Sequence, residues 1–235
     1  MQPYQREFVE FLLEAEALQV GEFKLKSGRV SPIFFNSGRI DTGGRLARLG
    51  LAYADTILER VGADGFDVVF GPAYKGIPLA VATVQGLSQR GVERAFLADR
   101  KEAKTHGAEA SGTSFAKQLL GRVPAEDARF VMVDDVLTTG GTKDEAVAFL
   151  RQVAPRCAFP ALLIVLDRQE TTPEGEDAVA SFSARTSIPV EPVLTLTDVL
   201  DYLAEVGRLG PDDLDRCRRY WGEYGTDPAK AWAAR

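Results

Sequence analysis

The stretch VMVDDVLTTGGT, residues 131–142, joins an apolar run to two acids and then to a turn of small residues. Residues 130–133 have the composition of a buried strand, and the following GTKDEAVAFLRQV, residues 141–153, has that of a helix. The stretch therefore predicts a strand–turn–helix unit, with Asp134 and Asp135 at the point where the strand leaves the sheet.

The predicted turn has the properties of a phosphate site. Its small residues and hydroxyls let backbone N–H groups point inward together, and the helix adds the positive end of its dipole. Asp134 and Asp135 precede the turn and are misplaced for holding phosphate. They suit the hydroxyls of an adjoining sugar, or a bound Mg²⁺ and its waters. The ligand implied is a ribose 5-phosphate unit, and the turn residues are Thr138, Thr139, Gly140, Gly141 and Thr142.

Three other interpretations of the stretch compete with a phosphate site. An ordinary turn rich in aspartate remains an alternative. A Walker B acid would need a G-x-x-x-x-G-K-[ST] loop elsewhere, and the sequence contains none. A dinucleotide fingerprint would need G-x-G-x-x-G after the first strand, and that is also absent.

Outward from this stretch, apolar runs alternate with amphipathic segments. Such alternation predicts an α/β fold with a central parallel sheet flanked by helices. Ligands of these sheets bind beyond the carboxyl ends of the strands, here the loops GPAYKG, DRKEAKTHG, DDVLTTGGT and LDRQE. Strands are expected at 67–71, 94–99, 128–134 and 159–167, and short extended pieces at 23–28 and 32–38. Helices are expected at 3–19, 43–62, 77–91 and 141–153, with two more within 197–222 that break at Gly210 and Pro211.

Composition narrows the classes of function. The 235 residues suit one domain, and the formal charge of −6 argues against nucleic acid or an anionic membrane as partner. Cys157 and Cys217 form no metal-ligand cluster. The N-terminal segment lacks a signal-peptide core, and no apolar run reaches the roughly 18 residues that span a bilayer. We expect a soluble, cytoplasmic protein.

The opening stretch resembles the phosphoribosyl pyrophosphate (PRPP) signature of type I phosphoribosyltransferases: apolar residues, two acids, then a Thr/Gly-rich turn. Four more stretches resemble the orotate phosphoribosyltransferases, in the order typical of that family: FKLKSGRVSPIFFNSGRI, FGPAYKGIPLA, RKEAKTHG and VLDRQE. The resemblance implies the type I phosphoribosyltransferase fold over residues 1–235, with an N-terminal hood of about residues 1–40 and a mobile lid of about 100–122. It also implies transfer from PRPP to orotate, giving orotidine 5′-monophosphate and pyrophosphate in pyrimidine (UMP) biosynthesis.

The expected PRPP site combines the turn with basic residues. In an acidic protein, the lid sequence DRKEAKTHG is a local cationic cluster that suits a departing pyrophosphate. Its sequence after His106 is longer and poorer in glycine than the family's. Lys104, His106, Asp134 and Asp135 are the expected catalytic residues. The resemblance implies PRPP contacts from Lys26, Tyr74, Lys75, Arg100, Lys101, Lys104, His106, Asp134, Asp135, Val136, Leu137, Thr138, Thr139, Gly140, Gly141 and Thr142.

The expected base site centres on Arg168, which directly follows an apolar strand. A guanidinium can form a two-pronged pair with the carboxylate of orotate, which purine bases and uracil lack. Pairing of Arg168 with Glu170 or Asp167 is the alternative. Adjacent strand residues point to opposite faces, so one of two phenylalanines can join the core while the other covers the base. By resemblance, the orotate contacts are Phe34, Phe35, Thr138 and Arg168.

The resemblance also implies Mg²⁺ as cofactor, held mainly by PRPP, with no direct protein ligand and with Asp134 and Asp135 reached through water. It implies a homodimer in which the lid is shared across the interface. Two other functions share the PRPP turn: a purine phosphoribosyltransferase, and a PRPP-sensing regulator without catalysis. The segment around Phe34 and the placement of Arg168 argue against the first, and the acidic charge argues against a regulator that binds nucleic acid.

Overall fold

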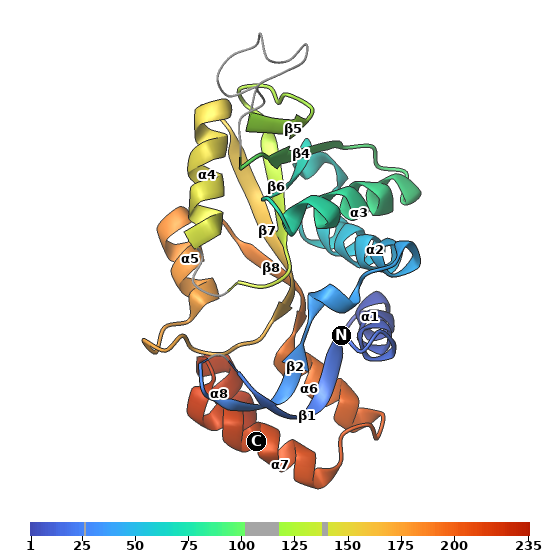
Figure 1. Ribbon diagram of the computed structural model, residues 1–235, viewed down its shortest axis with the longest axis vertical. Helices are drawn as coiled ribbons and strands as arrows, with labels where there is room; N and C mark the ends of the chain where they lie inside the picture. The colour runs from blue at the N-terminus through green and yellow to red at the C-terminus, as the bar shows by residue number, and fades with distance from the viewer. Residues whose placement is uncertain (26, 102–117, 138–140) are drawn as a thin grey trace.

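A six-stranded sheet, in the order β5-β4-β3-β6-β7-β8, forms the centre of the computed structural model (Figure 1), which describes residues 1–25, 27–101, 118–137 and 141–235. All neighbouring strands pair in parallel except β5, which runs antiparallel to β4 at the edge. The predicted central parallel sheet flanked by helices is confirmed, and β5 adds one antiparallel strand at its edge. The strands are β3 (Val68–Gly71), β4 (Ala95–Asp99), β5 (Leu119–Gly121), β6 (Arg129–Asp134), β7 (Ala158–Asp167) and β8 (Val190–Thr195).

Helices cover both faces of this sheet. Helices α2 (Gly43–Arg60) and α3 (Gly76–Gln89) lie on one face, and α4 (Gly141–Val153) and α5 (Ala178–Thr186) lie on the other (Figure 1). Because both faces are covered, β6 and β7 bury consecutive side chains, from residues 130–133 and 161–165, with no exposed surface. The central strands thus read as continuous apolar runs in the sequence, and they were predicted correctly.

Helices α2 and α3 approach each other backbone to backbone. A Cβ atom added to Gly50 would lie 2.0 Å from the carbonyl oxygen of Ala82, and one added to Gly86 would lie 2.2 Å from that of Gly50. Glycine at both positions therefore allows a helix–helix distance that no larger residue permits.

The N-terminal segment differs from its prediction. The helix predicted for residues 3–19 is α1 (Pro3–Glu14), which ends at Glu14. The strand β1 (Leu18–Lys24) begins at Leu18 and pairs with β2 (Val30–Phe35). Ala15 caps the helix, and Glu16 turns the chain with a φ of 55°. Ala15 and Leu18 are both buried. Their spacing continued the helical pattern across a turn, which is why the predicted helix was too long.

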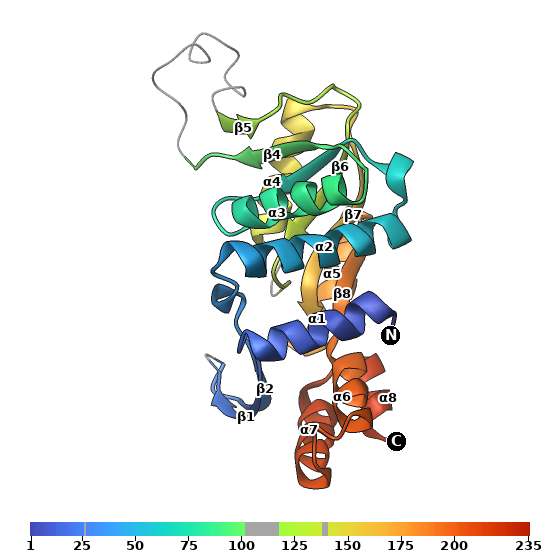
Figure 2. The ribbon, with the colours of Figure 1, turned by 90° about the vertical axis from the view of Figure 1, so that its right-hand side faces the viewer.

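The C-terminal helices form a separate layer beside the β1–β2 hairpin, at one end of the molecule (Figures 1 and 2). They are α6 (Leu196–Glu205), α7 (Pro211–Tyr224) and α8 (Asp227–Ala233). The predicted break is confirmed, because Gly210 caps α7 and Pro211 opens it. Four elements were not predicted from the sequence: β5, α5, β8 and α8. Within the described ranges, no helix has the length and apolar character needed to cross a bilayer.

Candidate active site

The carboxyl ends of the parallel strands bring the predicted loops to one edge of the sheet. Asp134 is the last residue of β6, Gly71 that of β3, Asp99 that of β4 and Asp167 that of β7. Six predicted site residues lie outside the described part of the chain, so their places in the site remain predictions: Lys26, Lys104, His106, Thr138, Thr139 and Gly140.

Asp134 is fixed within the protein, with 6% of its surface exposed. Its Oδ2 lies 2.5 Å from Nζ of Lys143, and its Oδ1 accepts the backbone N–H of Asp135 at 2.8 Å. Lys143 comes from the first turn of α4 and also donates to the carbonyl of Val136 at 3.1 Å. Burial raises the pKa of Asp134, against the opposing effect of Lys143. This pair was not predicted, because a lysine on an amphipathic helix is usually exposed.

Asp135 has a different environment. Its Oδ2 accepts hydrogen bonds from Oγ of Ser37 at 2.7 Å and from Nζ of Lys75 at 3.0 Å. Its Oδ1 accepts the backbone N–H of Val136 at 2.9 Å. Burial acts to raise the pKa of Asp135, but the bonds from Ser37 and Lys75 outweigh it and the net pKa is lowered. Asp135 is therefore a stable anion at neutral pH. Ser37 was not predicted, although it lies within the quoted stretch of residues 23–40.

The loop after β3 presents the residues expected to contact pyrophosphate. The side chain of Lys75 is 76% exposed although its Nζ reaches Asp135, and Tyr74 is 73% exposed. The two ends of this loop lie in close backbone contact. A Cβ atom on Gly71 would lie 2.0 Å from the carbonyl oxygen of Gly76, so a side chain at position 71 would clash. The Ala73 N–H donates to Oδ1 of Asp99 at 2.6 Å, which joins this loop to the end of β4.

A small cavity of about 130 Å³ lies between the end of β4 and α4. Arg100, Lys101 and Thr142 are among the residues that line it. Nε of Arg100 donates to the carbonyl of Leu119 at 3.0 Å, and Lys101 lies 3.9 Å from a carboxylate oxygen of Asp99. The structure therefore brings Arg100 and Lys101, the first two cations of the predicted lid, close to Thr142 at the end of the predicted phosphate turn.

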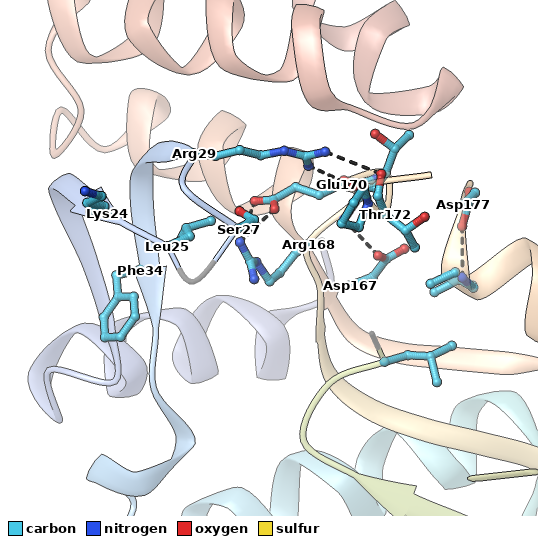
Figure 3. Close-up of a pocket in the computed structure, with 16 residues that line it drawn as sticks. Lys24, Leu25, Ser27, Arg29, Phe34, Asp167, Arg168, Glu170, Thr172 and Asp177 are labelled. Carbon is cyan, nitrogen blue, oxygen red and sulfur yellow. Dashed lines mark hydrogen bonds and ion pairs between the residues drawn. The ribbon is translucent and has the colours of Figure 1, made fainter. Parts of the chain in front are cut away.

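A larger cavity of about 600 Å³ lies beside the end of β7 (Figure 3). It is lined by Phe34, Leu137 and Arg168, which come from three different segments, and also by Lys24 and Arg29. Leu137 belongs to the predicted PRPP turn, while Phe34 and Arg168 are predicted base contacts. The cavity thus joins the predicted PRPP site to the predicted base site.

The two neighbouring phenylalanines of β2 divide between cavity and core. Phe34 lines the cavity and stacks on Phe23, with ring centroids 5.3 Å apart. Phe35 packs against the hydrophobic core instead, and the structure does not bring it to the cavity. This is the alternation expected for adjacent residues of a strand.

Arg168 lines the cavity and is also paired within the protein. Its Nη2 lies 2.7 Å from both carboxylate oxygens of Glu170 (Figure 3). The pairing that the sequence left open is therefore present together with the cavity contact. Arg29, which was not predicted, donates from Nη1 to the carbonyl of Thr171 at 2.8 Å on the same rim.

The carboxylates of the site do not form a cage for a metal ion. Among the described residues, no group of three or more His, Cys, Asp or Glu side chains could hold one. Both oxygens of Asp134 and both of Asp135 already accept bonds from the protein. This donor set fits a cation that takes most of its ligands from substrate and water.

Comparisons with known proteins agree with the geometry. The model of the phosphoribosyl transferase domain matches residues 39–207. The orotate phosphoribosyltransferase of Methylococcus capsulatus is 40% identical over 227 residues, or 96% of this chain and 100% of that protein. That of Pseudomonas aeruginosa is 42% identical over 228 residues, with coverage of 96% and 100%. The solved structure of orotate phosphoribosyltransferase from Francisella tularensis has a TM-score of 0.80 at 31% identity, covering 94% of this chain and 100% of that one.

Proposed function

The chain belongs to the phosphoribosyltransferase family, and from this premise we propose that it transfers the 5-phosphoribosyl group of PRPP to orotate. The products are orotidine 5′-monophosphate and pyrophosphate, in the biosynthesis of UMP. The cavity carries this proposal, because Arg168, Phe34 and Leu137 all line it, and Leu137 belongs to the predicted PRPP turn. The length and identity of the match to orotate phosphoribosyltransferases support it.

Orotate would bind in the cavity through its carboxylate and its flat ring. Arg168 supplies the cation for the carboxylate, and Phe34 supplies an aromatic surface for the ring. Thr138 completes the proposed contacts. Purine bases and uracil have no carboxylate, so they would leave the guanidinium without its partner. Recognition of this one group therefore accounts for the choice of base.

PRPP would extend from this cavity across the edge of the sheet. Its 5-phosphate would be held by the turn at residues 138–142, where the N-terminus of α4 favours an anion. Asp134 and Asp135 would face the ribose hydroxyls. Its pyrophosphate would be bound by Lys26 and by residues of the loops beyond β3 and β4, namely Tyr74, Lys75, Arg100, Lys101, Lys104 and His106.

The proposed reaction is a displacement at the anomeric carbon. The ring nitrogen of orotate gives up its proton and forms the new bond to this carbon. Pyrophosphate leaves with the electron pair of the broken C–O bond and takes up a proton. Asp135, whose pKa is lowered by Ser37 and Lys75 after burial has acted to raise it, can stabilise the positive charge that develops on the ribose. Lys104 and His106 can stabilise the pyrophosphate and are candidates for donating a proton to it.

We propose Mg²⁺ as the cofactor, held mainly by PRPP and reached by Asp134 and Asp135 through water. When bound, it supplies positive charge beside the leaving pyrophosphate. A homodimer in which each lid closes over the partner's site, and a cytoplasmic location, are also proposed from the family.

The function is tested by following the absorbance of orotate after adding PRPP and Mg²⁺ to the protein. We expect orotate to be consumed. In parallel assays in which uracil, adenine, guanine or hypoxanthine replaces orotate, we expect no consumption of the base. Consumption of a purine instead would make the protein a purine phosphoribosyltransferase. Binding of PRPP without consumption of any base would make it a regulator.

A further inference from the structure

The loop that follows β7, residues 168–172, is held by the C-terminal helices through its backbone. The carbonyl of Gln169 accepts the N–H of Thr226 at 2.9 Å, and the N–H of Thr171 donates to the carbonyl of Tyr224 at 2.8 Å. Between them, Glu170 forms an isolated bridge with Gly225. This loop, called here the Arg168 loop, therefore takes its shape from a distant part of the chain.

Trp221 of α7 makes the bond at the start of the Arg168 loop. Its indole Nε1–H donates to the carbonyl of Arg168 at 3.0 Å. The side chain is fully buried, and the ring of Tyr220 packs edge-on against it with centroids 4.8 Å apart. A buried indole has one donor in a fixed direction, so this bond sets the position of the Arg168 backbone.

The residue after Arg168 shows that the loop is held in an uncommon shape. Gln169 has a φ of 51°, in the left-handed region that side chains disfavour, and it is buried. Its Oε1 accepts the N–H of Thr197 at the start of α6. Such a conformation persists where the surrounding contacts fix it. Here the fixing contacts come from α6 and from the segment around Trp221.

Arg168 is thus held at two points. Trp221 fixes its backbone, and Glu170 holds its guanidinium at the rim of the cavity. A guanidinium–carboxylate pair depends on orientation as well as distance. We propose that Trp221 is a positioning residue for base recognition: it aims Arg168 at the carboxylate of the base without touching the base. This inference rests on the proposed function.

Trp232 provides a matched control. It is the only other tryptophan of the chain, it is also buried, and its Nε1–H donates to Oδ1 of Asp201 at 2.6 Å. That bond joins α8 to α6 and does not involve the Arg168 loop. Trp221→Phe and Trp232→Phe therefore remove the same chemical group from the same helical layer, but only the first releases Arg168.

The test measures both Michaelis constants of the two variants. Trp221→Phe should raise the KM for orotate about five- to tenfold, the effect expected of one lost hydrogen bond, with the KM for PRPP within about twofold of wild type. Trp232→Phe should leave both near wild type. A purely structural defect would lower the active fraction, and thus the apparent kcat, without this difference between the substrates. Equal changes in both constants, or equal effects of both variants, would overturn the proposal.

A second substitution decides the question if Trp221→Phe does not fold. Incorporating 3-benzothienylalanine at position 221 of the Trp232→Phe protein keeps the ring shape and replaces the N–H by sulfur. A raised orotate KM supports the positioning role, and a wild-type KM refutes it. Failure of the proposed function is separate: in that case the wild-type protein itself would not consume orotate.

Discussion

Asp134 and Asp135 adjoin in the chain, yet their carboxylates have opposite electrostatic surroundings. Burial raises the pKa of Asp134, whereas Ser37 and Lys75 outweigh the effect of burial at Asp135 and lower its pKa. Asp135 is therefore the anion best suited to stabilise a positive ribose. Asp134, bonded to Lys143 and to the Asp135 backbone, instead fixes the start of the turn.

Arg168→Ala tests the base contact at the scale of one residue. The variant should raise the KM for orotate roughly 10- to 100-fold, as expected for the loss of charged hydrogen bonds, and should change the KM for PRPP little. Steady-state kinetics with each substrate varied in turn measure this. Arg156→Ala is the control, because Arg156 forms an exposed pair with Glu126 outside the site. Equal increases in both constants would reject Arg168 as the carboxylate contact.

Asp167→Asn tests an electrostatic cost at the edge of the cavity. Burial raises the pKa of Asp167, so the folded protein keeps this proton to a higher pH than the unfolded chain does. The contribution of Asp167 to the stability of the wild-type protein therefore falls as pH rises from about 4, the ordinary pKa of an aspartate, through the pKa of Asp167 in the folded protein. Asparagine does not ionise and can still accept the N–H of Gln169. The free energy of unfolding of the variant, relative to wild type, should increase over that pH range in urea titrations.

Asp67→Asn should show the opposite sign. Hydrogen bonding from Arg129 lowers the pKa of Asp67, so its stabilising effect is present above the ordinary pKa and is lost as pH falls through the folded value. The variant should be less stable than wild type at pH 7, and the difference should shrink in acid. If both variants shift in the same direction, the assigned surroundings of these two carboxylates are wrong.

At the scale of elements, the contact of α2 with α3 sets the layer that covers one face of the sheet. Gly86→Ala should destabilise the protein by about 1–3 kcal/mol, because the added Cβ would meet the Gly50 backbone and force the helices apart. Thermal or urea unfolding measures the loss. Gly44→Ala, on the same α2 helix with nothing within 4 Å of its new Cβ, should be neutral or stabilising by up to about 1 kcal/mol. Similar losses in both would refute the packing argument.

Elements with a strong apolar pattern were predictable from the sequence. Short elements, and apolar patterns that run from one element into the next, were not. The runs that became β6 and β7 are buried on both faces, so their composition alone indicated strands. Strand β5 has three residues in a polar segment and gains its place only by pairing with β4. The predicted helix 3–19 was too long at its C-terminal end. Leu18 of β1 and Ala15, which caps α1, are buried in one core, so their apolar spacing resembled that of a continuing helix.

The candidate site was predictable where each residue carries its own chemical signal. Asp134, Asp135, Lys75 and Arg168 lie at strand ends or in the loops that follow, which the strand order brings together. Lys143 and Trp221 were missed as site residues for a physical reason. Their roles depend on tertiary contacts to Asp134 and to the Arg168 carbonyl, which leave no pattern in the local sequence.

At the scale of the whole molecule, the proposed homodimer predicts complementation between two impaired variants. Lys104→Ala should lower kcat strongly by removing a lid cation, and Arg168→Ala should lower activity at limiting orotate. If each lid serves the partner's site, their coexpression gives about half hybrid dimers, each with one complete site. Activity should then recover to about a quarter of wild type.

The control coexpresses Lys104→Ala with a Lys104→Ala/Arg168→Ala double variant, which has no intact lid and should stay inactive. Absence of recovery in the first mixture, with hybrid dimers confirmed by native mass spectrometry, would place each lid over its own subunit's site.

A crystal structure with PRPP and Mg²⁺ bound tests most directly the claim that residues 134–142 hold the ribose 5-phosphate. We predict the 5-phosphate at the start of α4, the ribose hydroxyls beside Asp134 and Asp135, and the anomeric carbon facing the cavity of Arg168. Density for PRPP at any other place, with this turn free of phosphate, would contradict this assignment of the ribose 5-phosphate site.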